Sequence, residues 1–147
     1  MGLKEDLLKI EAKLNKDIDD VLQTRVADGA KKAITASAQK NVYDAYSPVF
    51  WSRRMWNGGL LDERQISVHV ANGELTLTDD APWQHLKGGF YPKERLADMI
   101  AEGNPRFFFG DAGPRPFHEA AEKAFSKSGD FERTLASGLA VKGYKTR

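Results

Sequence analysis

The dipeptide Asn72-Gly73 constrains the fold more than any other feature, because it separates two short runs in which apolar and polar residues alternate. Asn-Gly is the preferred centre of a two-residue type I′ turn, which joins two antiparallel strands. With that turn, Val70 faces Leu75 and Val68 faces Leu77, all on one face. A slip of one residue would turn this face to solvent, so the turn and the apolar pattern predict the same register.

A long helical region is predicted before the hairpin, from Leu3 to about Tyr46, because its apolar residues recur in steps of three and four. They are Leu3, Leu7, Ile10, Leu14, Ile18, Val21, Leu22, Val26, Ala30, Ala33, Ile34 and Val42. No proline precedes Pro48, so either one helix runs through or two helices meet near Asn15–Asp20 or Asp28-Gly29. The first half is rich in leucine and isoleucine and the second in alanine, so we expect the halves to have different partners.

Beyond the hairpin the pattern becomes less regular. Residues Lys87–Pro92 are interpreted as a loop, Lys93–Glu102 as a short helix and Phe107–Phe109 as a short strand. The C-terminal end is expected to be helical again, and Asp130 is expected to open a last helix. One face of the preceding helix would contain Phe117, Ala120, Ala121, Ala124 and Phe125.

These elements predict a single α+β domain with a long N-terminal helix or two helices, a small antiparallel sheet and C-terminal helices. A length of 147 residues is typical of one domain. Its expected parts are an N-terminal helical region 3–46, a loop 47–63, a β-hairpin 64–79, a loop and short helix 80–113, and a C-terminal helical region 114–141.

Composition narrows the classes of function. The chain contains no cysteine, which excludes disulfides and thiolate metal sites. Its 22 basic and 21 acidic residues give a formal charge of +1, so no overall field attracts it to nucleic acid or to an anionic membrane. No apolar run reaches membrane-spanning length, and an acidic start differs from a signal peptide, so we expect synthesis in the cytoplasm.

Residues suited to catalysis are scattered along the chain. His69, His85 and His118 fall in a strand, a loop and a helix start, without the spacing of metal ligands. No serine occupies a Gly-x-Ser-x-Gly elbow. The pairs Asp19-Asp20 and Asp79-Asp80 are interpreted as a solvated helix face and a strand end. We therefore expect no enzymatic activity, no metal and no cofactor.

Two segments are candidates for contact with other proteins. The loop with Trp51, Arg53, Arg54 and Trp56 combines residue types that are enriched where interfaces are most tightly buried. The same loop could instead cover the chain's own core, or stack on nucleic acid.

The second segment is the apolar stripe of Leu7, Ile10, Leu14 and Ile18 in the N-terminal helix. A stripe at this spacing is compatible with ordinary packing inside the chain and with contact to another subunit. Both interpretations are open at this point.

Several motifs occur in a characteristic order. An alanine-rich helix ends in Val42–Pro48, then come Arg53-Arg54, Gly58–Asp62, the hairpin, and Arg115–Ala121 at the start of a helix. In this order the chain resembles the tail-completion, or neck (head–tail connector), proteins of long-tailed bacteriophages.

In that family a glycine-leucine pair precedes the first strand and a proline-phenylalanine pair opens a C-terminal helix. Gly59-Leu60 and Pro116-Phe117 match these pairs, whereas Gly88–Gly113 departs from the family pattern. The resemblance implies a virion protein that forms a ring, commonly sixfold, between a portal-side connector and tail-terminator or tail-tube proteins, with DNA passing through. The loop Trp51–Trp56, the N-terminal helix and Phe117 would then be contact surfaces.

Two other functions remain as alternatives. The first is a nucleic-acid-binding or nuclease-like domain that uses Arg53-Arg54, His69 and a basic C-terminal tail. That tail contains Lys142, Lys145 and Arg147 and is expected to be a solvated terminus or an electrostatic contact. The second is a toxin or regulator that dimerises through its N-terminal helix. Salt-dependent DNA binding or growth arrest on expression would distinguish these from a connector.

Overall fold

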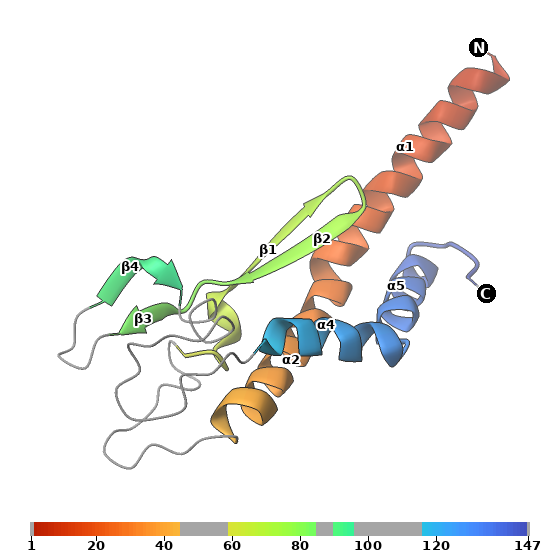
Figure 1. Cartoon of the computed structure of the whole chain (residues 1–147). Coiled ribbons are helices and arrows are strands. Elements are labelled where there is room, and N and C mark those ends of the chain that lie inside the picture. Colours follow the sequence, from red (N-terminus) through yellow and green to blue (C-terminus); the bar gives the residue numbers. More distant parts are fainter. Residues whose placement is uncertain (1, 45–58, 85–89, 96–115, 147) are drawn as a thin grey trace.

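A computed structural model of the chain describes residues 2–44, 59–84, 90–95 and 116–146. Within these residues a long N-terminal helical run is accompanied by two antiparallel β-hairpins and two C-terminal helices (Figure 1). The α+β class expected from the sequence is confirmed.

The N-terminal run is one continuous helix from Leu3 to Tyr43, so the single-helix alternative is the correct one. It comprises α1 (Leu3–Val21), a π-helical turn η1 (Leu22–Val26), α2 (Ala27–Ala38) and a second π-helical turn η2 (Gln39–Tyr43). At the first π turn, the Thr24 hydroxyl donates to the carbonyl of Asp20 at 2.7 Å. Such side-chain bonds compete with the regular backbone pattern. On either side of this turn the helix has different main neighbours, α5 for α1 and α4 for α2.

The first hairpin has the predicted register. Strands β1 (Ile66–Ala71) and β2 (Glu74–Asp79) pair Val70 with Leu75 and Val68 with Leu77. Asn72 and Gly73 have φ angles of 53° and 77°, as a type I′ turn requires. A short 3₁₀ turn, η3 (Glu63–Gln65), precedes β1.

A second hairpin was not predicted. Strands β3 (Pro82–Gln84) and β4 (Phe90–Arg95) form a separate two-stranded antiparallel sheet with an irregularity between Pro82 and Trp83. The interpretation of Phe90–Pro92 as loop and of Lys93–Arg95 as helix is therefore wrong. Pro82 and Pro92 fit these strands because both strands of a two-stranded sheet are edges, where proline is tolerated. Residues 96–102 and Phe107–Phe109 lie outside the described residues.

The C-terminal helices are α4 (Phe117–Lys127) and α5 (Asp130–Val141), so the predicted start at Asp130 is confirmed. Helix α4 packs along α2, and α5 packs against α1 and the first π turn. Phe117 and Ala121 of the predicted α4 face are buried, whereas Ala120 and Ala124 are exposed. The face that α2 covers is thus narrower than the sequence pattern suggested, because a single neighbouring helix covers only one stripe.

The apolar core consists of two clusters along the long helix. The first lies at the α2 end and joins Ala38, Val42, Tyr43, Leu60, Leu61, Ala81 and Phe117. Leu60 and Phe117 come from the two dipeptides that resemble the phage family, and both are fully buried. In this structure those residues hold the core of the fold together.

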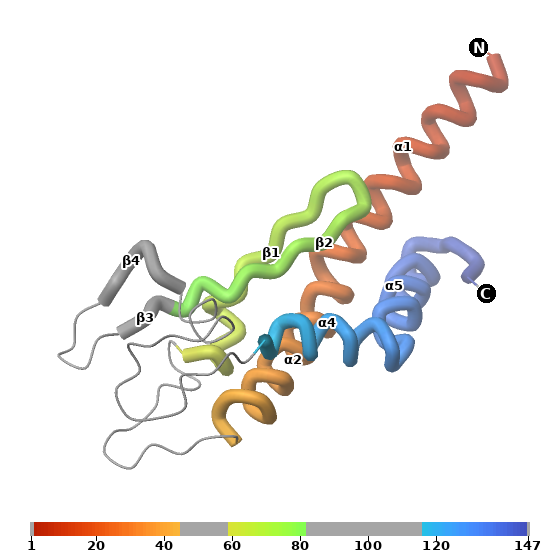
Figure 2. Tube along the Cα trace, viewed as in Figure 1, coloured from red at the N-terminus to blue at the C-terminus, as the bar shows by residue number. Residues whose placement is uncertain are grey.

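The second cluster surrounds the junction of α1 and α2, where the tube of Figure 2 shows the hairpin and α5 beside the long helix. Its centre is Val21, Leu22 and Val26, and it includes Ile18, Val70, Leu75, Phe125, Phe131, Leu135 and Leu139. The buried face of the hairpin, predicted from alternation, thus packs on the long helix. Within the described part of the chain, only the end of α1 near this junction joins the core.

Candidate protein-contact surface

The N-terminal half of α1 extends away from the other described elements (Figures 1 and 2). Its apolar residues face water: Leu3 is 77%, Leu7 56% and Ile10 64% exposed. Leu14, one step further, is half-buried. We call Leu3, Leu7, Ile10 and Leu14 the α1 seam. Leu8 is also 55% exposed but lies off this line. The exposed apolar residues that share one side of the helix are typical of an interaction surface.

Local sequence explains why this extension is helical but not why it is stable. Glu5 and Asp6 lie in the first turn, where acidic side chains interact favourably with the helix dipole. No side chain caps the first turn. A helix of about 12–15 residues is marginal in water by itself, so this segment depends on its attachment to the body or on a partner.

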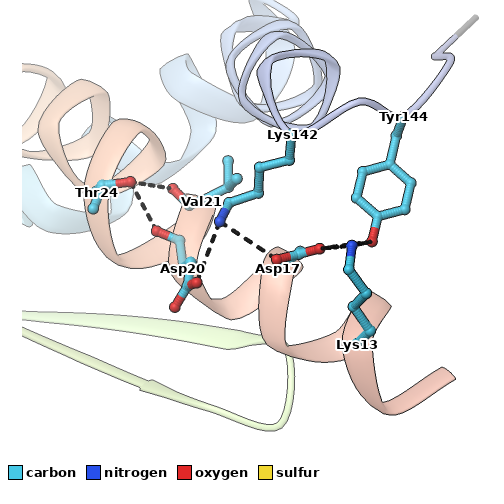
Figure 3. Close-up of polar contacts among 7 residues, drawn as sticks. All are labelled: Lys13, Asp17, Asp20, Val21, Thr24, Lys142 and Tyr144. Atoms are coloured by element: carbon cyan, nitrogen blue, oxygen red, sulfur yellow. Dashed lines mark hydrogen bonds and ion pairs between the residues drawn. The ribbon is translucent and has the colours of Figure 1, made fainter. Parts of the chain in front are cut away.

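The attachment is a polar cluster at the base of the seam, centred on Asp17 (Figure 3). Its Oδ2 accepts hydrogen bonds from the Tyr144 hydroxyl at 2.7 Å and from Lys13 Nζ at 3.1 Å. Lys142 Nζ lies 3.4 Å from Oδ1. These donors, Tyr144 first and Lys13 next, lower the pKa of Asp17 to about 2. The Asp17 side chain is only 14% exposed, so water screens these contacts less than on an open surface.

Two neighbouring carboxylates extend this attachment. Asp20 Oδ2 lies 3.3 Å from Lys142 Nζ, and this hydrogen bond is the main reason that the pKa of Lys142 is raised. Asp19 Oδ1 accepts a hydrogen bond of 2.9 Å from the backbone N–H of Gly73 at the hairpin tip. Asp19 is half-buried and Asp20 is 49% exposed, so this helix face is solvated as interpreted, but each carboxylate also binds a distant segment.

The same contacts involve the C-terminal tail, which is largely exposed, as expected of a solvated terminus, but is attached to the fold. Tyr144 and Lys142 fold back on α1, and Lys13 Nζ also lies 5.3 Å from the centroid of the Tyr144 ring. The tail up to Tyr144 is thus part of the folded structure. No local pattern could have indicated this, because the partners are more than 120 positions apart in the sequence.

The residues predicted for protein contact have different locations. Leu7 and Ile10 are exposed on the seam, and Leu14 lies at its base. Phe117 was expected at a contact surface. Its side chain is instead 0% exposed and packs in the chain's own core. The remaining four predicted residues, Trp51, Arg53, Arg54 and Trp56, lie outside the described residues.

The described residues contain no cluster of three or more histidine, cysteine or acidic side chains that could hold a metal ion. His69 is exposed on β1. His118 opens α4, where its ring lies 4.1 Å from the Phe117 ring, centroid to centroid. Among the helices of the described ranges, none combines the length and the apolar character needed to cross a membrane.

The model of the YomN family matches residues 6–141, which leaves out only residues 1–5 and 142–147. No curated protein and no solved structure matches the chain. The match includes most of the α1 seam, both hairpins and both C-terminal helices.

Proposed function

Because the chain belongs to the YomN family, which is phage-derived and of the SPBc2 prophage type, we propose that it is a structural virion protein of a bacteriophage. In this proposal it joins or completes the head–tail interface as an oligomeric ring through which DNA passes. The family supports the phage origin. The head–tail role is supported by the order of motifs that resembles tail-completion proteins.

The observation that carries the proposal is the exposed α1 seam on a packed body. Leu3, Leu7 and Ile10 remain in water although the same helix buries Val21 and Leu22 further along. An assembly protein needs such a surface, because contact with its neighbours must bury apolar area that the free chain exposes. The seam is therefore the surface through which we expect the chain to bind other proteins.

The body of the chain is suited to present this surface in a fixed position. Asp17 ties the base of the seam to the C-terminal tail, and Asp19 ties α1 to the hairpin tip. These links join segments that are distant in sequence, so the direction of α1 relative to the body is set by several contacts rather than one. A surface that is already held in one orientation loses less conformational entropy when it binds a partner.

The proposed partners are a portal-side connector on one side of the ring and tail-terminator or tail-tube proteins on the other. DNA would contact the protein only in passage, and a formal charge of +1 is compatible with this. A strongly basic channel would retain DNA through counterion release. In this proposal the chain performs no catalytic step and needs no cofactor.

The test is to mix the purified chain with connector and tail proteins of the same phage and to examine the mixture by electron microscopy. We expect rings and complexes with at least one of these proteins. The variant Ile10→Lys should weaken the complexes, whereas Ala12→Lys, which places the same charge on the opposite side of α1, should not. A chain that forms no ring and binds none of these proteins would refute the proposal.

A further inference from the structure

We propose that the α1 seam pairs with the α1 seam of a second copy of this chain, with the two helices antiparallel. The inference rests on the proposed use of the seam as a contact surface. It does not depend on the head–tail role, because it concerns the free protein in solution.

The seam has the spacing of a coiled-coil stripe. From Leu3 to Leu14 its residues are separated by four, three and four positions, which is the alternation of the two apolar positions in a heptad. The stripe is about 16 Å long at the rise of an α-helix. It ends at Asp17, the next position of the repeat, whose carboxylate is already bound by Tyr144 and Lys13.

In antiparallel orientation this short stripe is complementary to itself. When Leu7 of one copy faces Ile10 of the other, Leu3 of the first faces Leu14 of the second. Each seam residue then has an apolar partner, and the two-fold axis repeats every contact. Isologous contacts of this kind use one surface twice and close as a dimer.

Charges beside the seam select this orientation. Lys4 and Glu11 flank one side of the stripe, and Asp6 and Lys13 flank the other, each pair seven positions apart. In an antiparallel pair, each side of the stripe lies next to the same side of the other copy's stripe. Lys4 of one copy therefore lies near Glu11 of the other. Asp6 likewise lies near Lys13. All four flanking contacts of the dimer then join opposite charges.

In a parallel pair, the side of one helix that contains Asp6 and Lys13 would instead lie next to the side of the other helix that contains Lys4 and Glu11. Asp6 of one copy would lie beside Glu11 of the other, and two carboxylates would repel each other on both sides of the dimer. The charge pattern therefore disfavours the parallel arrangement that the apolar spacing alone would allow.

The described residues leave room along the seam for the antiparallel partner, because the N-terminal half of α1 extends away from the other described elements (Figure 1). The overlap includes only residues near 3–14, so each N-terminus ends beside the other copy's Asp17 and the two bodies lie at opposite ends of the pair. The Lys13 side chain is 70% exposed although it contacts Asp17 and Tyr144. Its ammonium has three protons, so it can also reach Asp6 of the second copy.

The interface is small. Two helical segments of this length bury less than the roughly 1,200–2,000 Å² that is typical of stable protein complexes. We therefore expect a dimer that forms at about micromolar to millimolar concentration and separates on dilution. A weak pair covers the apolar seam while other partners can still displace it.

Cross-linking tests the orientation. The chain has no cysteine, so Leu3→Cys and Leu14→Cys each introduce a single thiol. In the antiparallel pair these positions face each other, whereas like positions are separated by 11 residues, or about 16 Å. Disulfides need Cα atoms within about 7 Å. In a thiol–disulfide buffer we expect cross-linked dimer from the mixture of the two variants and little from either alone.

The same experiment can overturn the inference. Equal cross-linking of each variant alone would indicate a parallel pair or random collision, and no cross-linking in the mixture would indicate no pair at these residues. Sedimentation equilibrium of the unmodified chain provides the second measurement. We expect the average mass to rise toward that of a dimer, with at least tenfold weaker association for Ile10→Lys and no change for Ala12→Lys. A chain that stays monomeric up to millimolar concentration would refute the pair.

Folding of the variants is checked by circular dichroism, and the exposed position of Ile10 predicts no loss of structure in the body. Failure of this inference is distinguishable from failure of the proposed function. Rings with connector or tail proteins but no dimer of the free chain would refute the pair alone. A dimer without any such complexes would refute the head–tail role alone.

Discussion

Replacing Gly138 by alanine is expected to destabilise the chain, although alanine is the better helix former. Gly138 is buried in α5 where this helix crosses the end of α1. A Cβ atom there would lie 2.3 Å from Cγ1 and 3.0 Å from Cγ2 of Val21. Carbon atoms pack at about 3.5–4.0 Å, so one of the helices must move.

The magnitude follows from two opposing effects. Extra atoms in a packed core lower the free energy of unfolding by about 1–3 kcal/mol. The higher helix propensity of alanine offsets about 1 kcal/mol of this loss. Val21 is 2% exposed and β-branched, so its side chain cannot easily rotate away. We therefore expect the upper half of the cost and a net loss of about 1–2 kcal/mol. For a chain of this size that loss lowers Tm by about 2–8 °C.

The assay is urea unfolding followed by circular dichroism, extended to a double-mutant cycle. Val21→Ala alone should cost about 1.6 kcal/mol for two methyl groups, plus a cavity contribution. In the double variant, the new methyl group at position 138 occupies part of the space that Val21 vacates. The two changes should therefore be less destabilising together than their sum, by about 1–3 kcal/mol. Additivity within about 0.5 kcal/mol would refute the proposed clash.

Gly29→Ala is the matched control, because Gly29 also lies inside a helix, α2 of the N-terminal run. A Cβ there would meet only the edge of the Phe125 ring, at 3.2 and 3.3 Å. Phe125 is only half-buried, so its ring can shift by the few tenths of an ångström required. We expect Gly29→Ala to be neutral or stabilising, by up to about 1 kcal/mol.

Three further predictions concern individual contacts. Because the folded pKa of Asp17 is about 2 and its unfolded value is about 3.9, its stabilising effect is fully present above about pH 4 and is lost as pH falls through about 2. The Tm difference between wild type and Asp17→Asn should therefore shrink over this range, and a difference that is undiminished at pH 2 would contradict it. Gly73→Ala should cost about 1 kcal/mol in thermal unfolding, because its φ of +77° is strained for any side chain although nothing lies within 4 Å. Ser37→Ala removes a buried 2.7 Å hydrogen bond to the carbonyl of Phe117, and we expect a loss of about 1–3 kcal/mol in urea unfolding; an unchanged midpoint would show that this carbonyl finds another donor.

Local patterns in the sequence were sufficient for several elements. The register of the first hairpin was predictable because an Asn-Gly turn and the alternation of Val68 and Val70 act over neighbouring residues. The start of α5 at Asp130 was predictable for the same reason. The second hairpin was missed because Pro92 has a different meaning in an edge strand than in a central one, and only the pairing of β3 with β4 distinguishes the two.

The candidate site was predictable in part. The spacing of Leu7, Ile10 and Leu14 defined an apolar face, but only the structure shows that Leu7 and Ile10 are exposed on the extension of α1. The location of Phe117 was not predictable from the sequence, since a phenylalanine in a recurring motif is compatible with a contact surface or with a core. Its complete burial beside Leu60 assigns it to the core.

The sequence by itself therefore determined what depends on neighbouring residues: helical and strand periods, the turn at Asn72-Gly73, and the apolar character of the α1 seam. Only the tertiary structure decided which of these faces are covered. The attachment of Asp17 to Tyr144 and Lys142 joins residues far apart in the chain, and so does the crossing of Gly138 over Val21. Such contacts depend on how whole elements pack in space, and no pattern of nearby residues encodes them.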